Sequence, residues 1–183
     1  MTEQEIKEAA KRAADEKLFC RLLCKFEYEP RFILPLKASE GLFLSAIESG
    51  MSFDGYLVER FQNVDSLKAL EPEQSELARR KGLFDSLDVP QLETGSLQQI
   101  FAYLVTESEC VYLELGSPDS REISFETGLC VDCSDTGLRI VRFDTGMRRD
   151  RSATFIPYSS VVRLVFGTRS LRARKKYLSN NPQ

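Results

Sequence analysis

The stretch SFDGYLVERFQNVDSL, residues 52–67, holds the pattern that decides the fold. Its Asp-Gly pair is a turn signal, the short run that follows is rich in apolar residues, and the run closes on Val64 and Leu67. The same skeleton recurs in TGLRIVRF and FIPYSSVVRL, within residues 136–164, where the closing pair is Val161 and Leu164. The repetition predicts two similar β-rich units in one chain.

An alignment of the two copies predicts how each unit is built. Residues 41–47 align with residues 128–134. Residues 55–61 align with residues 137–143, and the second copy is longer by residues 144–157. Each copy contains strands, a turn, a further strand and a tight turn, after which the last strand returns to the first. A chain of this kind closes a small β-barrel, and closure removes the exposed edges of a sheet.

Three helices and two further turns are predicted from boundary residues. Each helix begins at a capping or proline signal, which is Thr2, Pro72 or Ser96 in turn. The predicted helices cover residues 3–16, 72–81 and 97–107. Residues 18–26 fit either a helix or a strand. The predicted turns are GSPDS, residues 116–120, and a hairpin turn at residues 144–146.

These elements give a mainly β fold with added helices and the following division of the chain. The expected parts are an N-terminal helix with a first small barrel, a helical linker, a helix with a second small barrel, and a tail. They cover residues 1–71, 72–95, 96–176 and 177–183.

A resemblance supports this division. The arrangement resembles the small SH3-like or Sm-like barrel used twice in tandem, over residues 32–70 and 97–172. The phrases FDGYLVERFQNV and FIPYSSVVRLVFGTRSL are similar to those of an uncharacterised group of bacterial proteins. The resemblance to that group implies neither an activity nor catalytic residues for this chain. Sm-like barrels often bind RNA, so RNA binding follows by analogy only.

Composition excludes several classes of function. The chain has 183 residues, 42% of them hydrophobic, and no run approaches the roughly 20 apolar residues of a membrane helix. The amino terminus lacks the apolar segment of a signal peptide, so we expect a cytoplasmic protein that does not bind membranes. With no histidine, the chain cannot perform Ser-His or Cys-His catalysis, and no glycine-rich phosphate-binding motif is present. We therefore expect no enzymatic activity and no cofactor.

Cysteines supply the best motif for a thiol or metal site. CVDC, which ends at Cys133, has the spacing of a zinc knuckle or a redox dithiol, and Cys20 with Cys24 could complete a four-thiolate site. Against this, the repeat alignment places Cys130 and Cys133 on apolar strand positions. We expect reduced thiols without metal and keep the thiol or zinc site as a distant alternative. The five cysteines are Cys20, Cys24, Cys110, Cys130 and Cys133.

Charge is divided unevenly along the chain. Residues 1–135 hold 14 Lys and Arg against 26 Asp and Glu, whereas residues 136–183 hold 11 basic and 2 acidic residues. Such a basic segment could contact a polyanion or an acidic protein surface, the protein's own acidic part included. The candidate contact residues are Arg148, Arg149, Arg151, Arg169, Arg172, Arg174, Lys175 and Lys176, with Tyr177 beside them.

The sequence therefore predicts a binding or assembly module. The favoured function is interaction with a protein partner or self-association, and the alternative is RNA or DNA binding through the basic end of the second barrel. Aromatic residues in strand patterns are expected to form core and not a stacking surface. They are Phe43, Phe53, Tyr56, Phe61, Phe125, Phe143 and Phe155.

Overall fold

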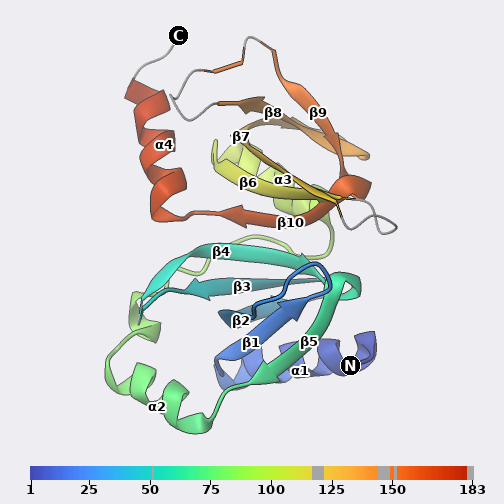
Figure 1. Cartoon of the computed structure of the whole chain (residues 1–183). Helices are drawn as coiled ribbons and strands as arrows, with labels where there is room; N and C mark the ends of the chain where they lie inside the picture. Colours follow the sequence, from blue (N-terminus) through green and yellow to red (C-terminus); the bar gives the residue numbers. More distant parts are fainter. Residues whose placement is uncertain (51, 117–121, 144–148, 151, 181–183) are drawn as a thin grey trace. The chain divides into compact units, whose positions relative to one another are not determined.

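A computed structural model describes residues 1–50, 52–116, 122–143, 149–150 and 152–180. The chain divides into two compact units, Met1–Gly95 and Ser96–Gln183 (Figure 1). Among the described helices, none is both long and apolar enough to span a membrane.

The first unit opens with helix α1 (Glu3–Glu16), as the capping signal predicts. The Thr2 hydroxyl accepts a hydrogen bond from the Glu5 amide at 3.2 Å, and the Glu5 carboxylate accepts one from the Thr2 amide at 2.7 Å. This pairing satisfies two of the amides that a helix start leaves without partners. The apolar face of α1 packs against strands β2 and β5 of the same unit.

Five antiparallel strands form the sheet of the first unit, in the order β5-β1-β2-β3-β4 (Figure 1). Residues 18–26, which the sequence left open, contain a strand, β1. Helix α2 (Pro72–Arg80) follows the sheet and begins with proline, as predicted. The strands are β1 (Cys20–Cys24), β2 (Arg31–Ala38), β3 (Leu42–Glu48), β4 (Phe53–Arg60) and β5 (Val64–Ala69).

The second unit has helix α3 (Leu97–Thr106), then five antiparallel strands in the order β10-β6-β7-β8-β9, then helix α4 (Arg169–Asn180). Helix α3 starts as predicted, because the Ser96 hydroxyl accepts a hydrogen bond from the Gln99 amide at 3.2 Å. The predicted turns at 116–120 and 144–146 lie mostly or wholly outside the described residues. The strands are β6 (Cys110–Gly116), β7 (Ile123–Cys133), β8 (Gly137–Arg142), β9 (Thr154–Pro157) and β10 (Val161–Phe166).

The prediction of a mainly β fold with added helices is confirmed, but closed barrels are not. In each unit the last strand returns to pair with the first, as β5 does with β1 and β10 with β6. Within the described part of each unit, no ladder joins that last strand to the strand before it, so the sheet stays open. In the first unit a helix covers the sheet instead, since α1 packs along β5, and covering is a second way to protect an edge.

The Asp-Gly pair in the stretch 52–67 does not form a turn. Asp54 and Gly55 lie inside β4, where Gly55 has a φ of +83° and the register with β3 shifts between Ala46 and Glu48. A positive φ next to such a shift is the signature of a β-bulge, which glycine accommodates without strain. The reversal occurs earlier in the chain, where the Ser49 amide donates to the Ser52 carbonyl at 2.8 Å.

The sequence alignment of the two copies is one strand out of step. It matched residues 55–61, nearly all in β4, with residues 137–143, nearly all in β8, but β4 is the fourth strand of its unit and β8 is the third of the other. The residue pairs that close the two copies do occupy corresponding positions. Leu67 lies opposite Leu22 of the first strand, and Leu164 lies opposite Leu113 of the corresponding strand β6.

Of the seven aromatic residues expected in the core, three are buried, and Phe53 and Tyr56 are partly buried. Phe43 and Phe61 are fully buried and stack with ring centroids 5.1 Å apart, and Phe143 is also buried. The prediction is wrong for Phe125 and Phe155, which are 60% and 46% exposed. Alternation along a strand fixes which face a side chain takes, but not whether another element covers that face.

Candidate functional site

The basic end of the chain folds as helix α4, an element that the sequence analysis did not predict. Gly167, with a φ of +68°, precedes the helix, and the Thr168 hydroxyl caps it by accepting from the Leu171 amide at 3.2 Å. Leu171 and Leu178, seven residues apart, are both buried. They pack with Cys110 and Phe143, so α4 is attached to the sheet of its own unit along one stripe.

Two of the predicted contact residues face the sheet and hold the helix in place. The Arg174 guanidinium carbon lies 5.3 Å from the centroid of the Phe143 ring, within the range of a cation–π contact. The Lys175 ammonium donates to the Glu109 carboxylate and to the Glu107 carbonyl, at 2.7 Å each. Both cations therefore serve the fold.

A third predicted residue, Arg149, belongs to the same structural set. Its guanidinium donates to the Leu178 carbonyl at 2.8 Å, which satisfies one of the carbonyls left without a partner in the last turn of α4. Arg148 and Arg151 lie outside the described residues.

The remaining predicted residues share the outer face of α4. Arg169, Arg172 and Lys176 are exposed and follow the spacing of one helix face. Tyr177, next to Lys176 in the chain, is 49% exposed. The Arg172 Nε donates to the Gly167 carbonyl at 2.6 Å, which holds the Arg172 guanidinium near the helix start. We call Arg169, Arg172, Lys176 and Tyr177 the outer face of α4.

The uneven distribution of charge along the sequence does not follow the boundary between the two units. Split at the boundary between the units, residues 1–95 hold 13 Lys and Arg against 18 Asp and Glu, and residues 96–183 hold 12 against 10. The units therefore differ far less than the two stretches of sequence do. What stands out is α4, which has five basic residues and no acidic one. The positive charge belongs to one helix, not to one unit.

The thiols are placed where they react poorly. Cys130 is buried on β7, and burial raises its thiol pKa above the ordinary value. Burial raises the pKa of Cys110 to about 11, with a further rise from Glu109. Cys133 is partly exposed, and its thiol pKa is raised as well, again mainly by burial. Raised thiol pKa values are the opposite of what a redox dithiol uses.

No group of three or more His, Cys, Asp or Glu side chains gathers as a metal site in the described part of the chain. Cys20 and Cys24 lie on β1 of the first unit and CVDC lies on β7 of the second. The thiol or zinc alternative thus gains no support from these positions.

A buried ion pair was missed at the sequence level. The Arg163 guanidinium is 1% exposed and donates to both Glu114 carboxylate oxygens, at 3.1 and 3.2 Å. The two residues lie opposite each other on β10 and β6. The available signal is an arginine within the apolar run VVRLVF, because a charge in a buried strand requires a partner.

Comparison with models of known protein families, with curated proteins and with solved structures finds no match to this chain. The outer face of α4 must therefore be interpreted from its own chemistry.

Proposed function

We propose that this protein is a non-enzymatic binding module and that the outer face of α4 binds an acidic segment of a partner protein. The observation that carries the proposal is the separation of the basic residues into two sets. Arg174 and Lys175 point towards the sheet of their unit, whereas Arg169, Arg172 and Lys176 are exposed together on the opposite side. Arg172 also donates to the Gly167 carbonyl, and Arg169 has a contact within the chain, but both side chains remain exposed. A helix attached along one face offers the other face to a partner without having to fold first.

Net charge favours a protein segment over a nucleic acid. Outside α4, the second unit has 7 basic and 10 acidic residues, so a polyanion long enough to extend beyond α4 would meet a net negative charge. At low salt, where the Debye length is about 30 Å, that repulsion reaches well beyond the helix. A short acidic segment can contact the three cations and avoid the acidic residues outside α4.

RNA or DNA binding is the second candidate, and Tyr177 favours it. An exposed aromatic ring beside cations can stack on a base while the cations contact phosphates. The two candidates differ in the salt dependence they imply, since each phosphate contact adds about −0.9 to the log-log slope for duplex DNA.

The test is a titration by fluorescence anisotropy with two labelled probes, a ten-residue peptide of alternating Glu and Gly and a ten-nucleotide single-stranded RNA. We expect the peptide to bind more tightly than the RNA at about 10 mM salt, where the repulsion of a long polyanion is screened least. Arg169→Ser, Arg172→Ser and Lys176→Ser together should weaken peptide binding about tenfold, because exposed ion pairs contribute up to about 1 kcal/mol each.

The matched control is Arg174→Ser with Lys175→Ser on the same helix. It should lower stability and leave peptide affinity nearly unchanged, since these side chains face the sheet. Tighter binding of the RNA, lost in the triple variant, would select the nucleic-acid function. Equal losses in the triple variant and the control would contradict both.

We further propose that each unit is one copy of a small SH3-like or Sm-like module and that the chain belongs with the similar bacterial proteins. The support is the strand order, in which the fifth strand of each unit lies beside the first and the other strands follow in sequence. A 3-10 turn precedes the fifth strand in both, η1 (Phe61–Asn63) and η3 (Tyr158–Ser160). An experimental structure in which the two units do not superpose over these elements would overturn the assignment.

A further inference from the structure

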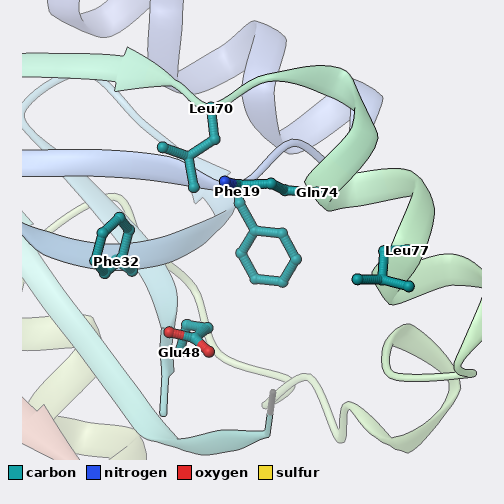
Figure 2. A pocket seen from close by; sticks show the side chains of 6 residues that line it. All are labelled: Phe19, Phe32, Glu48, Leu70, Gln74 and Leu77. Carbon is teal, nitrogen blue, oxygen red and sulfur yellow. The ribbon is translucent and has the colours of Figure 1, made fainter. Parts of the chain in front are cut away.

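The first unit contains a half-open pocket between its sheet and helix α2, separate from α4. Figure 2 shows Phe19 at its centre, with Glu48 and Leu77 on different sides of the opening. Its volume is about 360 Å³, near the lower end of the roughly 300–1,000 Å³ of ligand pockets. The described lining residues are Phe19, Phe32, Glu48, Leu70, Gln74 and Leu77.

The walls of the pocket are held in place by buried contacts. The Phe19 ring stacks on Phe53 and Phe84, with centroids 6.0 and 5.7 Å away. The Phe19 amide donates to the buried Ser75 hydroxyl at 3.1 Å, which ties α2 to the start of β1. A pocket between elements joined in this way is formed before a ligand arrives, so binding does not have to order it.

The rim of the pocket is apolar and exposed to solvent. Phe32 is 44% exposed and Leu77 is 46% exposed, although both side chains are large and apolar. A small molecule that enters the pocket leaves part of this rim in water, whereas a protein segment covers pocket and rim together. The rim thus favours an occupant larger than the pocket.

Charge selects among such segments. Among the lining residues that the structure describes, Glu48 alone carries a charge. It is half-buried and already takes part in a contact within the fold, but a carboxylate has several acceptor positions. A cation beside an apolar group matches this arrangement, and an anion there is repelled.

We propose that this pocket binds a protein segment that presents one large apolar side chain next to a Lys or Arg. The apolar side chain contacts Phe19 and Leu77, and the neighbouring cation pairs with the Glu48 carboxylate. The proposal is independent of the function proposed for α4, which lies in the other unit and takes acidic segments.

The chain has no tryptophan, so a tryptophan in a peptide reports on binding without background. The probe is acetyl-Gly-Lys-Trp-Lys-Gly-amide, titrated with the 183-residue chain, and its tryptophan is excited selectively. We expect a blue shift of its emission and saturable binding in the submillimolar range. The peptide with Glu in place of both Lys residues should show neither at the same concentrations.

Variants locate the site. Glu48→Gln should weaken binding of the Lys peptide about fivefold, as loss of a partly exposed ion pair implies. Leu77→Ser should remove the blue shift. The matched control is Glu73→Gln, which removes a charge from the exposed surface of α2 outside the lining residues and should leave affinity unchanged.

Several results would overturn the proposal. Equal binding of the Lys and Glu peptides, or of wild type and the Glu48→Gln variant, removes the role of charge. Tryptamine binding as tightly as the peptide means that the pocket serves small amines. Self-association that is lost in the Leu77→Ser variant, measured by analytical ultracentrifugation, means that a second copy occupies it.

Discussion

Among single residues, Phe61 shows how a core position follows from the sequence. It follows the apolar-rich strand β4 and precedes the closing pair Val64 and Leu67, and the structure buries it against Phe43. Phe125 also lies in a strand pattern yet is exposed, and its ring stacks on that of Tyr112 with centroids 5.8 Å apart. The sequence contains no sign of this difference, because coverage of a face depends on elements distant in the chain.

Phe61→Ala should therefore cost about 3 kcal/mol or more of unfolding free energy, since it removes a fully buried ring and leaves a cavity. Phe125→Ala is the matched control and should cost less than about 1 kcal/mol, because much of its ring is already in water. Urea denaturation followed by circular dichroism measures both. Similar costs for the two variants would show that the burial assignment is wrong.

The buried thiols predict a loss of stability in alkali. Burial raises the pKa of Cys20 from an ordinary 9.0 to about 12. Below pH 9 both folded and unfolded chains keep this proton, so the stabilising effect of the raised pKa is complete there. As pH rises from about 9 towards 12, the unfolded chain loses the proton first, and the unfolding free energy falls by up to about 1.4 kcal/mol per pH unit.

Comparison of wild type with the Cys20→Ala variant isolates this contribution from the other groups that titrate in alkali. The variant should be less stable at pH 8 but should lose less further stability between pH 8 and pH 10.5, as measured by urea denaturation. Parallel pH profiles would mean that the Cys20 thiol is not shielded.

Among the elements, local signals predicted the helices with capping residues and the strands with apolar runs. Helices α1 and α3 begin one residue after Thr2 and Ser96, and α2 begins at Pro72, because these signals act through nearby hydrogen bonds or a fixed dihedral. The sequence pattern predicts a turn at Gly55, whereas the structure has a β-bulge there. Glycine permits both conformations, and only the pairing of β4 with β3 distinguishes them. Helix α4 was not predicted because its apolar positions are few among many charges.

Strand pairing yields a test through glycine. A Cβ atom at Gly137 would lie 2.5 Å from the Ile156 carbonyl oxygen and 2.5 Å from the Phe155 ring, so Gly137→Ala must push β8 and β9 apart. We expect a cost of about 2 kcal/mol, typical of overpacking. Gly41→Ala is the control, since no atom lies within 4 Å of its Cβ position and its φ is not positive. Differential scanning calorimetry should find only the first variant destabilised, and equal melting temperatures would contradict the pairing of β8 with β9.

For the whole molecule, the sequence located the basic cluster but not its division into two sets. Which cations are exposed depends on the rotation of α4 about its axis, which Leu171 and Leu178 fix against the sheet. Nothing in the local pattern around Lys175 and Lys176 reveals that the first binds Glu109 and the second faces water. The sequence therefore predicts which part of the chain carries the basic site, but not which side chains form its exposed surface.

The central claim is that the outer face of α4 selects its partner by charge, and a charge reversal tests it most directly. Arg169→Glu, Arg172→Glu and Lys176→Glu together should exchange the preference of the protein, so that a peptide of alternating Lys and Gly binds the variant as the Glu peptide binds wild type. Anisotropy titration with both peptides measures this, and circular dichroism confirms that the variant is folded. A variant that is folded but still prefers the Glu peptide would contradict the claim.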